Sequence, residues 1–395
     1  MDLFKKCYDF ELADKYKDAG IYPYFHSLES RQDIVVEMEG KRQIMIGSNN
    51  YLGLTSNEEV INAAVEATNN FGTGCSGSRF LNGTTVGHIE MEKELAEFLN
   101  KEDCVTMSTG FQTNLGVISA LCGRGDVVVC DKENHASIYD AIRLSYADMV
   151  RFKHADMEDL EEKLKNIPQE KGILIVTDGV FSMGGDICNL PKLVELKKKY
   201  GARLMVDDAH GLGILGKNGR GTAEHFDLED EVDVIAGTFS KSLASLGGYC
   251  AGDRKIIDYI RHNSRPFIFS ASIQPSSIAA VRKSLEIIKR EPERRENLLN
   301  IANYMREALK SRGVKIRESN TPIIPIYTYE PEITLKACKM LFDRGVYVNP
   351  VLPPATPPGE CLIRTSYTAT HTKELMDEAA DIIRDVFAEL GILEG

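Results

Sequence analysis

Apolar and polar positions along the chain follow two periods, one typical of amphipathic helices and one typical of buried strands. Apolar residues at helical spacing predict helices over 57–72, 87–102, 189–201 and 292–313. The third of these has a capping residue at Asn189, Pro191 in its first turn and a stop at Gly201. Short apolar runs predict strands over 104–108, 126–130, 172–178, 202–208 and 232–239.

The order of these elements predicts an α/β fold. Helices and strands alternate from about residue 50 to 285, which is typical of a mostly parallel central sheet with helices on both faces. We expect three segments along the chain: an N-terminal helix with short strands (1–49, with Gly40 in a turn), a large α/β domain (50–288) and a small C-terminal α+β domain (289–395).

Composition and charge argue against several classes of protein function. The 395 residues are 43% hydrophobic and 27% charged, as in an ordinary globular protein. A formal net charge of -12 argues against a general nucleic-acid partner. The nine cysteines are scattered without CxxC or zinc spacing, so we expect reduced thiols and no metal site. The N-terminus has no signal-peptide pattern and no apolar run is long enough to span a bilayer, so we expect a cytoplasmic protein.

Chemically functional side chains follow most of the predicted strands. In an open α/β sheet, ligands bind beyond the carboxyl ends of the strands. A lone histidine or aspartate there is usually structural, but convergence of many such residues indicates a shared site. The residues that follow the strands are Thr109, Gly110, Phe111, Asp131, Asn134, His135, Asp178, Ser182, Asp207, Asp208, His210, Ser240 and Lys241.

One motif in this region is misleading. Residues 211–216 read GLGILG and match the GxGxxG pattern of nicotinamide-binding proteins. That interpretation requires a helix to begin there and an acid to end the next strand. Instead turn residues follow, and the next strand ends in Thr238, Phe239, Ser240 and Lys241, so we do not expect a dinucleotide site.

Lys241 stands among small residues directly after a predicted strand. A lysine amine can form a Schiff base with a carbonyl substrate or with pyridoxal phosphate. Pyridoxal phosphate would also need a carboxylate beside its pyridine nitrogen, an imidazole near its ring, and hydroxyl and N–H groups at a helix start for its phosphate. Each of these groups is present at the predicted strand ends.

Six motifs in order then make the chain similar to a known family. They are SNNYLGL, GTGCSGSRFLNGT, NHASIYD, DGVFSMGGD, MVDDAHGLG and GTFSKSLASLGG. From about residue 20 onward the chain resembles the α-oxoamine synthase family of fold-type I pyridoxal-phosphate enzymes. The resemblance implies a pyridoxal-phosphate-dependent acyltransferase that works as a homodimer, with active sites at the interface.

The resemblance also implies roles for individual residues. Lys241 would form the Schiff base and act as acid and base, and Asp207 would pair with the pyridine nitrogen. His210 would bond the phenolic oxygen, and His135 would stack on the ring and help hold the amino-acid carboxylate. The remaining implied positions are Gly110, Phe111, Thr238 and Ser240 around the phosphate, Ser270 and Ala271 of the partner chain beside it, Asn49 and Ser182 at the substrate and cofactor, and Arg364 at the substrate carboxylate.

Among family members, the chain is most similar to those that join L-serine to a long-chain acyl-CoA with loss of carbon dioxide. Glycine with acetyl-CoA, or alanine with a pimeloyl thioester, remain alternatives, as does an aminotransferase or lyase that needs no thioester. Retention of Lys241 argues against a non-catalytic subunit. Peripheral membrane contact stays open, because the product would be a lipid.

Three further residues or segments have plainer explanations. Asp208 is expected on the opposite face of its strand from Asp207, where it would be structural. His88 is expected to make a contact at a helix start, without a chemical role. The segment 353–358 (PPATPP) reads as a rigid connector or as a loop that helps to position Arg364.

Overall fold

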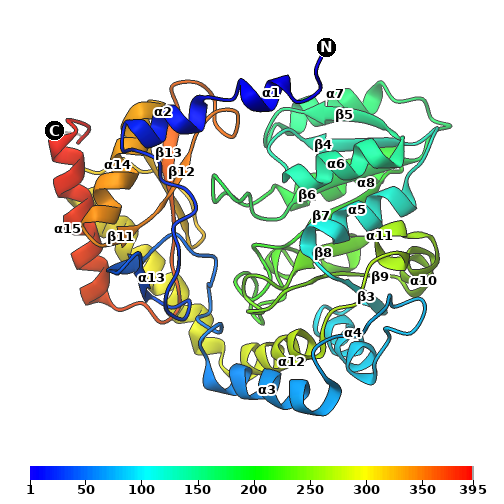
Figure 1. The fold of residues 1–395 in the computed structure, drawn as a ribbon. Coiled ribbons are helices and arrows are strands. Elements are labelled where there is room, and N and C mark those ends of the chain that lie inside the picture. The colour runs from blue at the N-terminus through cyan, green and yellow to red at the C-terminus, as the bar shows by residue number, and fades with distance from the viewer. Residues whose placement is uncertain (394–395) are drawn as a thin grey trace. The chain divides into compact units, whose positions relative to one another are not determined.

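The computed structural model describes residues 1–393, and their contacts group the chain into two compact units (Figure 1). One unit contains residues 49–297, and the other combines residues 1–48 with the chain from Leu298 onward. The N-terminal segment therefore shares a unit with the C-terminal region. The three sequential segments expected from the sequence remain a proposal about how the chain folds.

The larger unit is built on a seven-stranded sheet with the order β3-β9-β8-β7-β6-β4-β5. Strands β5, β4, β6, β7 and β8 run parallel to one another, and β9 runs antiparallel to both β8 and β3. The mostly parallel sheet confirms the predicted fold class. The strands are β3 (Asp103–Met107), β4 (Val127–Asp131), β5 (Asp148–Phe152), β6 (Ile173–Asp178), β7 (Arg203–Asp207), β8 (Val234–Thr238) and β9 (Gly248–Gly252).

Helices cover both faces of this sheet. Helix α5 packs on α6, and α7 packs on α8. Right-handed crossovers place these two pairs on opposite faces. On the α5 face, Ile118 and Ile138 pack with Val128, Val176 and Met205 in one buried apolar cluster. The helices of this unit are α3 (Glu58–Phe71), α4 (Val86–Phe98), α5 (Gly110–Leu121), α6 (Ala136–Ser145), α7 (Met157–Lys165), α8 (Leu190–Tyr200), α9 (Thr222–His225), the 3₁₀ turn η1 (Glu229–Glu231), α10 (Arg254–Asn263), α11 (Arg265–Ile268) and α12 (Pro275–Arg290); α13 (Pro292–Ser311) begins here and continues into the other unit.

The smaller unit contains two three-stranded sheets, ordered β1-β2-β11 and β10-β13-β12. Gly40, at a φ of 69°, makes the turn between β1 and β2, as predicted. The strands of the smaller unit are β1 (Val35–Met38), β2 (Lys41–Met45), β10 (Ile323–Tyr329), β11 (Val346–Tyr347), β12 (Asn349–Val351) and β13 (Cys361–Ser366). Besides the end of α13, its helices are α1 (Lys5–Tyr8), α2 (Leu12–Asp18), α14 (Pro331–Asp343) and α15 (Lys373–Glu389).

Several local predictions are confirmed. Asn189 accepts a hydrogen bond from the N–H of Lys192 and caps α8, and Gly201 ends that helix in the left-handed region. His88 Nδ1 accepts a hydrogen bond from the N–H of Thr85 and so closes the capping box of α4. Residues 211–216 form turns rather than a helix start. In the central sheet, strands β5 and β9 were not predicted. Through residue 393, no helix has both the length and the apolar character to cross a membrane.

Candidate active site

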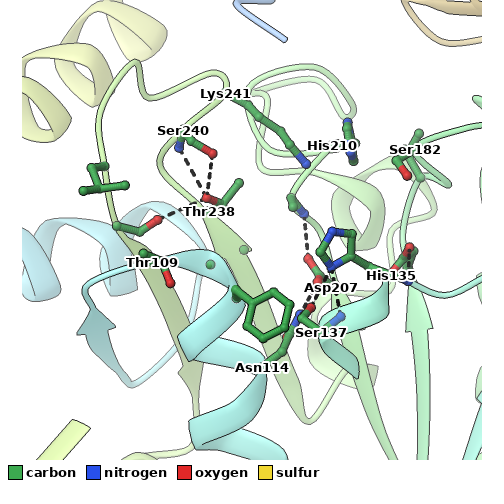
Figure 2. A pocket seen from close by; sticks show the side chains of 18 residues that line it. Thr109, Asn114, His135, Ser137, Ser182, Asp207, His210, Thr238, Ser240 and Lys241 are labelled. Carbon is green, nitrogen blue, oxygen red and sulfur yellow. Dashed lines mark hydrogen bonds between the residues drawn. The ribbon is translucent and has the colours of Figure 1, made fainter. Parts of the chain in front are cut away.

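The carboxyl ends of the strands surround a cavity of about 230 Å³ in the larger unit (Figure 2). Strand β6 ends at Asp178, β7 at Asp207 and β8 at Thr238, so the sheet itself brings these residues to one edge. Nine of the predicted site residues line the cavity: Gly110, Phe111, His135, Ser182, Asp207, His210, Thr238, Ser240 and Lys241.

Asp207 is held by hydrogen-bond donors on both carboxylate oxygens. Asn114 Nδ2 donates to Oδ2 at 2.6 Å, and the N–H of Ala209 donates to Oδ1 at 3.1 Å. The side chain is buried but faces the cavity. Two donors stabilise the ionised carboxylate. Asp207 is therefore suited to sit beside a group that must keep a positive charge.

Asp178 lies directly across from Asp207 in the parallel register of β6 and β7, and it also lines the cavity. Its Oδ2 accepts a hydrogen bond from the N–H of His135, while its buried Oδ1 has no partner among the described residues. Burial and the neighbouring charge of Asp207 raise the pKa of Asp178 well above its usual value. The two neighbouring carboxyl groups therefore differ in their hydrogen bonds. Both oxygens of Asp207 accept hydrogen bonds, whereas one oxygen of Asp178 has no partner among the described residues.

His135 is the N-cap residue of α6. Its Nδ1 lies 2.7 Å from Ser137 Oγ and accepts from the N–H of Ser137 at 3.3 Å. Burial lowers the pKa of His135; the charge of Asp207 opposes this effect and that of Lys241 adds to it. The ring therefore stays neutral at physiological pH, and its position over the cavity is fixed by the start of the helix.

His210 follows β7 in the turn after Asp207. Its Nδ1 lies 2.7 Å from the hydroxyl oxygen of Tyr51, and both side chains are buried. Tyr51 belongs to the SNNYLGL motif at the beginning of this unit. The phenol therefore orients the imidazole toward the cavity that it lines.

The start of α5 lies at one corner of the cavity, where its N–H groups could hold an anion. The first N–H groups of a helix have no partner within the helix, and here they belong to Gly110 and Phe111. Thr238 Oγ1 and Ser240 Oγ lie 3.0 Å apart beside them. A Cβ added to Gly110 would come within 2.7 Å of the Cβ of Thr238, so only glycine lets the helix start approach β8 this closely.

A buried aromatic ring, Phe239, anchors the turn that holds Lys241 and explains the glycine at position 247. Phe239 is fully buried and stacks on Tyr249 at a centroid distance of 6.0 Å. A Cβ on Gly247, which has a φ of 138°, would come within 2.5 Å of the Phe239 ring. Tight packing below the turn therefore fixes the backbone of Lys241, while its side chain extends into the cavity (Figure 2).

Three predicted site residues of the larger unit do not line this cavity, and a fourth belongs to the smaller unit. Ser270 Oγ accepts a hydrogen bond from Gln112 on α5, and the carbonyl of Ala271 accepts one from Ser108. Asn49 Oδ1 accepts from the hydroxyl of Tyr51 at 3.3 Å. Arg364 belongs to β13 of the smaller unit, where it is buried and donates to Ser366 Oγ at 3.3 Å. The roles expected of these residues stay predictions.

The structural explanation of Asp208 agrees with its contacts. Its carboxylate accepts hydrogen bonds from the N–H and the hydroxyl of Thr222, both at 2.6 Å. A Cβ on Gly221 would come within 1.8 Å of Asp208 Oδ2, so the surrounding loop is built tightly around this carboxylate. Burial raises the pKa of Asp208 to about 6, although the hydrogen bonds from Thr222 act in the opposite direction.

A third histidine, His154, lies at the same edge of the sheet. His154, after β5, lies 3.0 Å from Asp131 Oδ1 through Nδ1 and 2.9 Å from Asp186 Oδ2 through Nε2. Burial alone would lower the pKa of His154, but these two hydrogen bonds raise it to about 10. The resulting ion cluster fixes the loop of Ser182, in which the N–H of Phe181 donates to the carbonyl of Asp186.

Three polar residues that line or support the cavity were missed as members of the site. Asn114 lies one helical turn after Gly110, and Ser137 lies two residues after His135, so spacing from a predicted residue was the available signal. Tyr51 is 159 residues from His210 in the sequence, and spacing gives no sign of that contact.

Comparison with known proteins identifies relatives along the whole chain. The family model for aminotransferase class I and II matches residues 41–383. A serine palmitoyltransferase from Sphingobacterium spiritivorum is 50% identical over 383 residues, which cover 97% of this chain and 96% of that protein. An 8-amino-7-oxononanoate synthase from Bacillus velezensis is 42% identical over 380 residues, with coverage of 96% and 97%. A solved structure of a serine palmitoyltransferase variant from S. paucimobilis, with pyridoxal phosphate and myriocin bound, has a TM-score of 0.96, 36% identity and full coverage of both chains.

Proposed function

The chain belongs to the aminotransferase class I and II family, and from this premise we propose that it is a serine palmitoyltransferase. It would be a pyridoxal-phosphate-dependent enzyme of the α-oxoamine synthase type that condenses L-serine with palmitoyl-CoA or a similar long-chain acyl-CoA. The products would be 3-ketodihydrosphingosine, coenzyme A and carbon dioxide, at the entry to sphingolipid synthesis. The observation that supports this most is the similarity to a serine palmitoyltransferase along the whole chain, together with the convergence of nine expected residues on one cavity.

The residues present fit pyridoxal phosphate. The phosphate would bind at the start of α5, where Gly110 leaves room and the hydroxyls of Thr238 and Ser240 stand close together. The ring nitrogen would be held by Asp207, whose carboxylate is kept in place by two donors. His210, oriented by Tyr51, would hold the phenolic oxygen.

When bound, the cofactor supplies an aldehyde that bonds to amines and a ring that accepts an electron pair. Lys241 would hold the cofactor through Nζ and would act as the base that removes the Cα proton of L-serine. Asp207 would keep a proton at the ring nitrogen, because the carboxylate stabilises the positive charge there. His135 would cover the ring and donate a hydrogen bond to the carboxylate of L-serine.

Substrate contacts outside the cavity belong to the same proposal. Arg364 would bind the substrate carboxylate through its planar guanidinium, and Asn49 would line the substrate site. Ser270 and Ala271 of the partner chain in a homodimer would complete the phosphate site. We also propose a cytoplasmic location with peripheral contact at the inner membrane face, since the product is a lipid.

The test measures how purified protein, loaded with pyridoxal phosphate, responds to the amino-acid substrate and to the acyl-CoA substrate. The cofactor absorbance is recorded on addition of L-serine, glycine or L-alanine, and thiol release is followed with acyl-CoAs from acetyl to palmitoyl. The proposal expects spectral change with L-serine and thiol release that is fastest with palmitoyl-CoA. Preference for L-alanine with pimeloyl-CoA, or for glycine with acetyl-CoA, would contradict it and assign the chain to a sister activity.

A further inference from the structure

Asn114 connects two groups that face the active-site cavity. It is 3% exposed and lies on α5, one turn after the helix start. Its Nδ2 donates to Asp207 Oδ2 at 2.6 Å and to Ser137 Oγ at 2.9 Å, so each of its two N–H bonds has its own acceptor (Figure 2). One uncharged amide therefore joins the carboxylate of β7 to the first turn of α6.

Ser137 passes this connection on to His135. Because Ser137 Oγ accepts from Asn114, its own proton is available to donate to His135 Nδ1 at 2.7 Å. The N–H of Ser137 also donates to the same nitrogen. Two donors directed at Nδ1 leave no room for a proton there. The neutral ring must therefore have its proton on Nε2.

We propose that Asn114 and Ser137 are positioning residues that hold Asp207 and His135 as one unit and fix His135 in the Nε2–H tautomer. Asn114 sets the plane of the Asp207 carboxylate, and Ser137 leaves Nε2–H as the remaining donor of the His135 ring. That donor is the one that a substrate carboxylate needs. The assignment deepens the proposed function and rests on it for the identity of the bound groups.

Contacts on the same two helices provide matched controls. Thr113, beside Asn114, is fully buried and donates to the carbonyl of Thr109 at 3.0 Å. Ser145, on the same helix as Ser137, is buried and donates to the carbonyl of Ile142 at 2.7 Å. Thr113→Val and Ser145→Ala each remove a buried hydroxyl without touching Asp207 or His135.

The first experiment measures binding by the holoenzyme and its variants. Asn114→Leu keeps the number and branching of the side-chain heavy atoms and should weaken pyridoxal-phosphate binding about ten- to a hundredfold, because a hydrogen bond to a charged group is lost. Ser137→Ala should raise the KM for L-serine about three- to tenfold and leave kcat within about twofold. The two control variants should keep both constants within about twofold of wild type. Wild-type affinities in Asn114→Leu, or an unchanged KM in Ser137→Ala, would overturn the assignment.

The second experiment does not depend on activity, and it needs a variant only to assign the signals. Nitrogen-15 NMR of the histidine-labelled wild-type protein, with and without pyridoxal phosphate, reports which ring nitrogen of His135 is protonated; His135→Gln identifies its signals. A proton on Nε2 is expected in both forms, and a proton on Nδ1 would overturn the inference. If wild type fails to bind pyridoxal phosphate, the proposed function falls, while the tautomer measured in the cofactor-free protein still decides the role of Ser137.

Discussion

Two histidines at the same edge of the central sheet have opposite surroundings. His135 meets hydrogen-bond donors at Nδ1, from the hydroxyl and the N–H of Ser137, and its pKa is lowered. His154 meets carboxylates at both nitrogens, from Asp131 and Asp186, and its pKa is raised to about 10. The first is therefore neutral and open to the cavity, and the second is a half-buried cation that fixes a loop.

His135 and His154 are the same residue type, but their hydrogen-bond partners differ. The partners therefore tell a catalytic residue from a structural one, whereas the residue type does not. The neighbouring residues Asp207 and Asp208 show the same contrast. Asp207 faces the cavity, whereas Asp208 is surrounded by the loop of Thr222. A histidine or carboxylate at a strand end is thus assigned by what its polar atoms contact.

Replacing each aspartate by asparagine gives the largest expected contrast. Asp207→Asn should lower kcat/KM by at least about a hundredfold, because the charge that stabilises the ring nitrogen is lost. Asp208→Asn should instead lower the free energy of unfolding by about 1–3 kcal/mol, since its hydrogen bonds with Thr222 are disturbed. Steady-state kinetics and urea unfolding measure the two effects, and equal losses of turnover would remove the distinction between them.

Replacing His154 tests whether this histidine stabilises the fold and takes no part in catalysis. His154→Gln leaves Asp131 and Asp186 without their cation and should lower the free energy of unfolding by about 3 kcal/mol. The KM for L-serine of the folded fraction should change less than in His135→Gln. Urea unfolding and kinetics on both variants provide the comparison. A stable His154→Gln protein with lost turnover would place His154 in the chemistry instead.

The smallest expected effect is the pH dependence of the stability that His154 contributes to the fold. The pKa of His154 in the folded protein, about 10, lies above the ordinary histidine value of 6.5. Its stabilising contribution is therefore complete below pH 6.5 and is lost as the pH rises through 10. The difference in unfolding free energy between wild type and His154→Gln should shrink between pH 7 and pH 10. A difference that is constant over this range would contradict a charged His154.

The sequence predicted the sheet and most of the cavity because both depend on local signals. Apolar runs located β4, β6, β7 and β8, and the residues after them follow from the parallel order of the strands. Strand β5 is half exposed and β9 contains two glycines, so neither has the pattern of a buried strand. The contact between Tyr51 and His210, and the link through Asn114, depend on packing between distant segments, for which periodicity has no signal.

The role of Lys241 is tested most directly by locating the covalent bond. Holoenzyme is reduced with borohydride, digested, and searched by mass spectrometry for the pyridoxyl-modified peptide. The account predicts the modification on Lys241 alone, and none in Lys241→Ala protein treated in the same way. Modification of a different lysine, or an unmodified Lys241 in fully loaded protein, would contradict it.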